Sequence, residues 1–127
     1  MVVADTTVWI EFFNDPTSRE KRAIDLLIDE NQLAFVGAVL TELLQGCRTS
    51  QEAHLIFDHV SALPYLEMSF STWQRAGEIS SDLRRKGTTI PLMDLIIAAL
   101  AMEHAAEVFT TDPHFEKIPS LKLYRAK

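Results

Sequence analysis

The sequence predicts an α/β protein, specifically an α/β/α sandwich with a mostly parallel central sheet of about five strands. Short β-branched or aromatic runs alternate along the chain with longer stretches of helical spacing, as in sandwich folds of this class. The chain has 127 residues, of which 47% are hydrophobic and 24% are charged, enough to bury a core. No repeat, low-complexity segment or long linker interrupts the alternation, so residues 1–127 are expected to form one domain.

Five segments have the length and composition of β-strands. They are MVVAD (1–5), LAFVG (33–37), YLEMS (65–69), AEVFTTD (106–112) and LKLYR (121–125). The segments are joined mostly by helix-length connections, and such connections favour parallel pairing.

Five further stretches have apolar residues at helical spacing. They are SREKRAIDLLIDE (18–30), AVLTELLQGC (38–47), SQEAHLIFDHVSAL (50–63), STWQRAGEISSDLRRKG (71–87) and TIPLMDLIIAALAM (89–102). Pro91 suits the first position of the last helix, where its missing N–H group costs nothing. The clearest loops are NDPTS (14–18) and RKGTTIP (85–91).

Four acidic residues occupy similar places relative to these elements. Asp5 ends the first strand, and Asp112 follows the strand VFTT. Glu42 lies early in the helix after LAFVG, and Asp94 lies in the first turn of the apolar helix. Alone, Asp94 would be an ordinary helix-start residue favoured by the helix dipole. Because residues beyond the carboxyl ends of parallel strands converge on one rim, the four acids together are candidates for a single cluster.

Such a cluster must bind protons or cations. Two like charges about 5 Å apart repel by roughly 3 kcal/mol at an effective dielectric constant near 20. Carboxylates without a nearby cysteine or a ligand-spaced histidine favour a hard ion, Mg²⁺ or Mn²⁺, over zinc. Ions held in this way serve phosphoryl chemistry, so the residues alone predict bound Mg²⁺ and phosphate as substrate.

The formal net charge of −6 would ordinarily argue against a nucleic-acid partner. Setting aside the four candidate site acids leaves 14 of the 18 acidic residues against 12 basic ones, a balance of −2. Arg84, Arg85 and Lys86 are consecutive bases just before the Asp94 helix, where they could hold a phosphate backbone. The alternative is a solvated helix end whose charges complement the dipole.

The composition also bears on the compartment. Cys47 is the single cysteine, so it has no partner for an internal disulfide or a zinc pair. The longest apolar stretch contains Asp94 and ends near Glu103, which makes it too short and too charged for a membrane span. With no leader-like start to the sequence, we expect a cytoplasmic protein in a reducing compartment, without a membrane partner.

Four motifs together resemble the PIN-domain family. They are ADTTVWIEFF, LTELLQG, IPLMDLIIAALAMEH and VFTTDPHFEKI, in the family's order and approximate spacing over essentially the whole chain. In particular, the chain is similar to VapC-type toxins of bacterial type II toxin–antitoxin systems. The resemblance implies that Asp5, Glu42, Asp94 and Asp112 form a catalytic Mg²⁺ site, with Mn²⁺ as a substitute. It further implies an endoribonuclease that leaves a 5′-phosphate and a 3′-hydroxyl, works as a homodimer and is inhibited by a cognate antitoxin.

Hydroxyl groups near the acids are expected to orient the carboxylates. Thr6 and Thr110 match threonine or serine positions of the family, whereas Thr7 is assigned to ordinary turn chemistry. His114 departs from the family, in which many members carry another acid at this position, so a tightly held second metal ion is less expected. It could contact substrate phosphate, bind a site carboxylate or cap the turn after Pro113, and the turn role is favoured.

Two other functions compete with the nuclease. A non-catalytic RNA- or protein-binding module on the same fold would predict an incomplete acid set, and all four acids are present. A phosphoryl-accepting domain with Asp5 as nucleophile would require a lysine near the acids, and no site segment supplies an obvious one. The aromatic residues Trp9, Phe12 and Phe13 are expected in the core or at a protein interface. The resemblance implies that this region and neighbouring helices line a groove for the antitoxin.

Overall fold

The computed structural model describes residues 1–126 and contains a four-stranded sheet in the order β3-β2-β1-β4. The strands are β1 (Val2–Ala4), β2 (Leu33–Val36), β3 (Tyr65–Leu66) and β4 (Glu107–Phe109). Strand β1 pairs with β2 and β4, β2 pairs with β3, and every pair is parallel. The predicted α/β class and parallel sheet are confirmed.

The sheet has one strand fewer than expected. The segment LKLYR (121–125) follows the edge of β4 but forms only an isolated parallel bridge, between Val108 and Leu123. Two backbone hydrogen bonds support it: the Val108 N–H donates to Lys122 O at 2.9 Å, and the Tyr124 N–H donates to Val108 O at 2.8 Å. Pairing stops there because β4 itself ends at Phe109, one residue further on.

Six α-helices and one 3₁₀ helix complete the described part of the chain. They are α1 (Thr6–Asn14), α2 (Arg19–Asp29), α3 (Gly37–Gln45), α4 (Ser50–Val60), α5 (Phe70–Arg85), α6 (Leu92–Glu103) and η1 (Pro113–Lys117). The five expected helices occur within a few residues of their predicted bounds. Pro91 is the N-cap of α6 rather than its first residue. Helix α1 was not predicted, although its buried residues Val8, Trp9 and Phe12 are at helical spacing.

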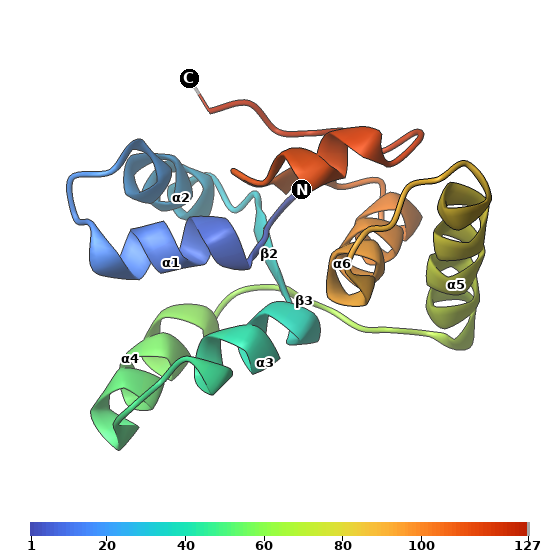
Figure 1. Cartoon of the computed structure of the whole chain (residues 1–127). Coiled ribbons are helices and arrows are strands. Elements are labelled where there is room, and N and C mark those ends of the chain that lie inside the picture. Colours follow the sequence, from blue (N-terminus) through green and yellow to red (C-terminus); the bar gives the residue numbers. More distant parts are fainter. Residues whose placement is uncertain (127) are drawn as a thin grey trace.

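The helices cover both faces of the sheet. In Figure 1, α1 and α2 lie on one side of the strands and α5 and α6 on the other, while α3 and α4 extend from one end. Helix α6 touches β4, α3 and α5, and for this reason every residue from Leu95 to Ala101 is buried. A helix that is surrounded by other elements in this way is apolar on all sides, because none of its faces meets water. No helix in residues 1–126 is both long and apolar enough to cross a membrane.

Trp9 joins α1 to the sheet. Its side chain is fully buried, and its ring lies 5.9 Å from Phe35 of β2 in an edge-to-face arrangement. Phe12 and Phe13 pack against the same indole at 5.2 and 5.9 Å. Since Asp5 is the N-cap of α1, this packing also fixes the residue that begins the helix.

Replacing Trp9 by alanine is expected to lower the free energy of unfolding by about 3–5 kcal/mol, because it leaves a cavity at the centre of this aromatic group. Urea denaturation followed by circular dichroism measures the loss. Trp73→Ala is the matched control, because Trp73 is 57% exposed and its removal should cost little. Equal losses in the two variants would contradict the assigned role of Trp9.

Candidate metal centre

The carboxyl edge of the sheet carries all four candidate acids. Asp5 directly follows β1, and Asp112 follows β4 at the start of η1. Glu42 is on α3, which begins where β2 ends, and Asp94 is in the first turn of α6. Asp5 is only 2% exposed, whereas the other three are half-buried. The rim that the sequence predicted is therefore present, with one acid closed off from solvent.

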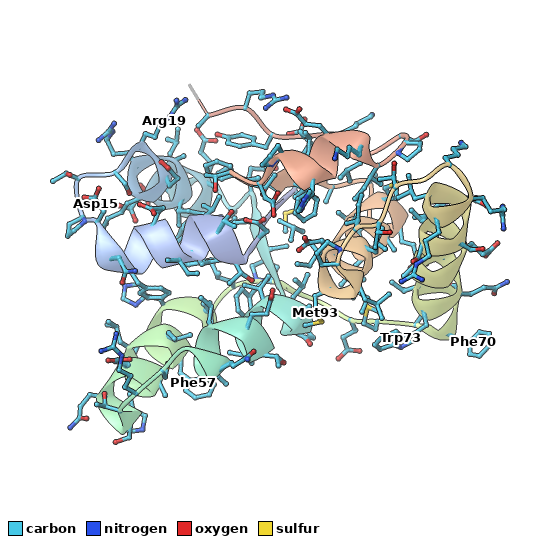
Figure 2. All side chains as sticks on the ribbon, in the orientation of Figure 1. Asp15, Arg19, Phe57, Phe70, Trp73 and Met93 are labelled. Carbon is cyan, nitrogen blue, oxygen red and sulfur yellow. The ribbon has the colours of Figure 1, made fainter. Side chains whose placement is uncertain are left out.

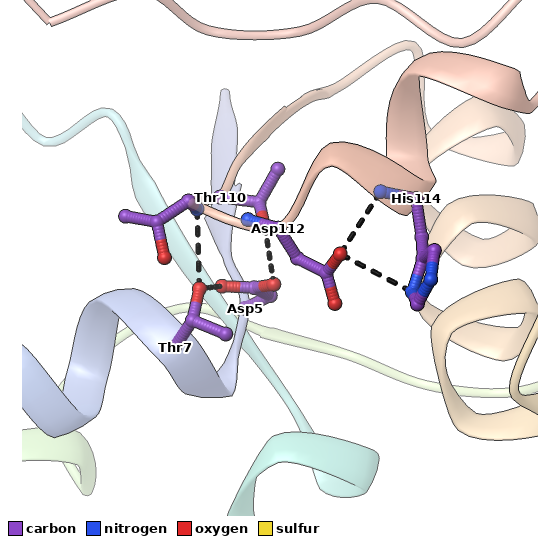
Figure 3. A network of polar contacts seen from close by, with 6 residues as sticks. Asp5, Thr7, Thr110, Asp112 and His114 are labelled. Carbon is purple, nitrogen blue, oxygen red and sulfur yellow. Dashed lines mark hydrogen bonds and ion pairs between the residues drawn. The ribbon is translucent and has the colours of Figure 1, made fainter.

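Both oxygens of Asp5 accept hydrogen bonds. Oδ1 accepts from the Val8 N–H at 3.3 Å and from the Thr7 hydroxyl, and Oδ2 accepts from the Thr110 hydroxyl. Thr110 Oγ1 also accepts from the Asp112 N–H at 2.9 Å. Figure 3 shows this network, which connects the start of α1 to the segment after β4. The position of the Asp5 carboxylate is thereby fixed from two sides.

Thr6 holds a second acid. Its hydroxyl donates to Glu42 Oε1 at 2.6 Å, across from α1 to α3. The structure thus places Thr6 and Thr110 on candidate site carboxylates. It adds Thr7, which sequence reasoning assigned to turn chemistry: besides contacting Asp5, its Oγ1 accepts from the Thr111 N–H at 3.1 Å. Only the fold, which brings Thr111 to α1, reveals that role.

The acids influence one another electrostatically. Burial, followed by the negative charges of Asp112, Asp5 and Glu42, raises the pKa of Asp94 to about 6, while His114 acts in the opposite direction. Burial also raises the pKa of Asp5, against the lowering effect of its three hydrogen bonds. The negative charges of Asp112, Asp5 and Glu42 thus all act on Asp94, and we refer to these four acids as the acid cluster.

His114 lies at the edge of this cluster. Its Nδ1 is 3.2 Å from Asp112 Oδ1, and the same carboxylate oxygen accepts from the His114 N–H at 2.9 Å (Figure 3). The turn-capping role favoured for His114 is therefore performed by the side chain of Asp112. Asp94, Asp112 and His114 each present one ligand atom, all within 4.8 Å of one another. The turn at Pro113 thus places an imidazole beside the carboxylates that the sequence predicts as metal ligands.

Arg84, Arg85 and Lys86 stay outside the cluster. All three are exposed at the end of α5, and Arg85 pairs with Asp82 on the same helix. Within residues 1–126, no hydrogen bond or ion pair joins them to the four acids. Their contact with substrate phosphate stays a prediction.

Known proteins resemble this chain over nearly its whole length. The family model described as PIN domain matches residues 2–121. Ribonuclease VapC11 from Mycobacterium tuberculosis is 28% identical over 122 residues, which cover 93% of this chain and 91% of that protein. Ribonuclease VapC2 from Rickettsia felis is 28% identical over 124 residues, covering 94% and 92%.

Solved structures share the fold. VapBC2 from Rickettsia felis, bound to a DNA fragment from its promoter, contains a chain with a TM-score of 0.84 and 26% identity, with 98% of each chain covered. DNA-bound VapBC from Salmonella typhimurium gives a TM-score of 0.85 at 22% identity, covering 97% of this chain and 96% of that chain.

Replacing Asp94 by asparagine is expected to stabilise the metal-free protein by about 1–2 kcal/mol at pH 7.5, after allowing for solvent screening of a half-buried carboxylate and for a lost dipole interaction. The pKa of Asp94 is raised from 3.8 to about 6 by folding, so the parent loses stability as the pH rises through that interval. The variant should lack this loss.

Urea denaturation in EDTA between pH 4 and pH 7.5 tests this expectation, with Asp58→Asn, a change at an exposed acid of α4, as the control. An Asp94 variant less stable than the parent at pH 7.5, with the parent's pH dependence, would restore the helix-start interpretation.

Proposed function

The chain belongs to the PIN domain family, and from that membership we propose that it is a Mg²⁺-dependent endoribonuclease toxin that hydrolyses RNA phosphodiester bonds and is inhibited by a cognate antitoxin. One observation carries the proposal: Asp5, Glu42, Asp94 and Asp112 meet at one rim although they come from four separate segments. A complete acid set of this kind argues against the non-catalytic binding module, for which no cluster of mutually repelling charges is needed.

The chemistry of the cluster suits a hard divalent cation. Burial, followed by the charges of three other carboxylates, makes ionisation of Asp94 unfavourable and raises its pKa to about 6, and a bound cation would offset the repulsion between these charges. Mostly oxygen ligands favour Mg²⁺, and the His114 imidazole is compatible with Mn²⁺ as a replacement. The proposed ligands are the four acids, and His114 stands beside Asp112, where it could contact either the ion or a substrate phosphate.

The surrounding residues position the proposed ligands. Thr7, Thr110 and the Val8 N–H hold Asp5, and Thr6 holds Glu42, so neither carboxylate needs to reorganise when a cation or substrate arrives. Bound at this rim, Mg²⁺ would polarise a phosphate oxygen and lower the pKa of an attacking water. Asp94 must lose its proton to serve as a ligand, so activity should fall as the pH drops below about 6.

RNA is proposed as substrate because the relatives that match over nine-tenths of this chain are named ribonucleases. The domain extent, the cellular compartment and the oligomeric state are also proposals. We propose one nuclease domain over residues 1–127, since the family model accounts for residues 2–121. A cytoplasmic homodimer is proposed from the lone Cys47 and from the resemblance to VapC-type toxins.

An antitoxin partner is supported by a cavity next to the acid cluster. It has a volume of about 410 Å³ and lies between α1, α3 and α4, with Glu42 among its lining residues. Its apolar walls include Ile10, Phe13 and Leu55, which suits the side chains of a bound segment. Of the aromatic residues expected in the core or at a protein interface, Trp9 and Phe12 belong to the buried core and Phe13 lines this cavity. The VapBC structures described above are complexes of toxin and antitoxin.

Cleavage of RNA tests the proposal. Purified protein free of antitoxin should cut total cellular RNA into discrete fragments with Mg²⁺ and leave it intact with EDTA. Asp5→Asn and Asp94→Asn should each reduce the cleavage rate by at least a hundredfold, because each removes a proposed ligand. Asp58→Asn, at an exposed acid away from the rim, should cleave like the parent.

Intact RNA from a folded parent protein that binds Mg²⁺ would contradict the proposal. Cleavage that persists in both Asp5→Asn and Asp94→Asn would contradict the assignment of the site.

A further inference from the structure

A second cavity lies where β4 ends, next to the start of α2. We call it the rim pocket: it has a volume of about 220 Å³, and the lining residues that matter here are Arg19, Glu20, Thr110, Thr111, Tyr124 and Arg125. They come from the start of α2, the end of β4 and the C-terminal segment. The volume is below the roughly 300–1,000 Å³ of sites for drug-sized ligands, so the pocket suits one ring system.

The rim pocket adjoins the acid cluster. Thr110 lines the pocket and donates its hydroxyl hydrogen bond to Asp5. Thr111, the next lining residue, precedes Asp112 directly and is tied by its N–H to Thr7. A polymeric substrate with one unit at the acid cluster could therefore place the neighbouring unit in the rim pocket.

The carboxylate of Glu20 restricts which chemical group could bind in the rim pocket. Its Oε2 accepts no hydrogen bond from any residue between 1 and 126 and is closed off from solvent, so the carboxylate must turn toward the pocket before Oε2 can meet a ligand. An acceptor in this state favours a ligand that brings N–H donors, because an unmade hydrogen bond at a buried polar atom is unfavourable. A phosphate group brings negative charge and no donor, so Glu20 disfavours it.

The other charged groups of the pocket are cationic. Arg19 donates from Nη2 to the Ala126 carbonyl at 3.2 Å and lies beside the C-terminal segment in Figure 2. Arg125 forms only a long ion pair with Glu116, at 3.6 Å, and its side chain is 74% exposed. Tyr124 contributes an aromatic wall, held edge-to-face by Phe109 at 5.1 Å. The pocket thus combines one carboxylate acceptor, two guanidinium groups and a ring.

Guanine matches that combination. It presents N–H donors at N1 and N2, which a carboxylate can accept together, and acceptors at O6 and N7, which arginine contacts in pairs. Adenine, cytosine and uracil each lack part of this pattern. Exposed bases of single-stranded RNA are recognised by such edge contacts together with aromatic or arginine surfaces.

We propose that the rim pocket binds a guanine base of single-stranded RNA, in a nucleotide that flanks the cleaved phosphodiester, with Glu20 accepting from its N1 and N2 hydrogens. This inference rests on the proposed ribonuclease function, since it names a specificity-determining residue for that reaction. Glu20 is a binding residue for the base and takes no part in the bond cleavage.

The test compares the parent, Glu20→Gln and Glu30→Gln on a pool of single-stranded RNA with randomised sequence, in Mg²⁺, by sequencing the cut ends. Glu30 is the exposed C-cap of the same helix, at the end away from the pocket, so Glu30→Gln is the matched control. The parent and the control should prefer guanine at one fixed position from the cut. Glu20→Gln should lower that preference about tenfold.

A parent without guanine preference at any fixed position, or a preference unaltered in Glu20→Gln, would overturn the inference, while the loss of cleavage in Asp94→Asn would still support the nuclease. Thermal melting of each variant verifies that it is folded.

A binding measurement separates the inference from the proposed function if no RNA is cut. Fluorescence anisotropy in EDTA would compare a labelled oligoribonucleotide containing guanosine with one containing inosine, which lacks the N2 amino group. The parent should bind the guanosine oligonucleotide more tightly, and Glu20→Gln should bind both equally. Equal binding by the parent would overturn the inference whatever the outcome of the cleavage assay.

Discussion

The concentration of negative charge at one edge of the sheet is the constraint on which the rest of this structure depends. Four carboxylates from distant segments lie close enough that three of them, with burial, raise the pKa of Asp94 to about 6. Like charges this close move apart unless the scaffold holds them in place, and charges that are held together bind protons or cations. The hydrogen bonds to Asp5 and Glu42 keep these two carboxylates in place.

The scaffold is rigid where the charge is greatest. Strand β1 is buried along its length, and the residue directly after it is Asp5, the N-cap of α1. Helix α6 presents Asp94 from its first turn and is buried from Leu95 to Ala101, so this carboxylate cannot withdraw from its neighbours. Because the carboxylates cannot move apart, burial and then their mutual repulsion raise the pKa of Asp94 in the metal-free protein, and the same repulsion would favour a bound cation in the proposed function.

The alternation of strands and helices, together with acids at the strand ends, was sufficient to predict the fold class and the rim. Three features were beyond that reasoning. The role of Thr7 depends on Thr111, which is 104 residues away, and the approach of His114 to Asp94 depends on how the chain turns after Pro113. The rim pocket forms from segments at both ends of the chain, so no local pattern around Glu20 could reveal it. Such contacts are set by tertiary packing, and sequence periodicity reports only which face of an element is buried.

Calorimetric titration of Mg²⁺ into the metal-free protein at pH 7.5 and pH 5 tests the central claim most directly, which is that the four acids form a cation site. We predict binding at pH 7.5, and affinity weaker by about tenfold at pH 5, because Asp94 must release a proton below its pKa of about 6 before it can bind the ion. Absence of binding at pH 7.5, or binding of equal strength at both pH values, would contradict the claim.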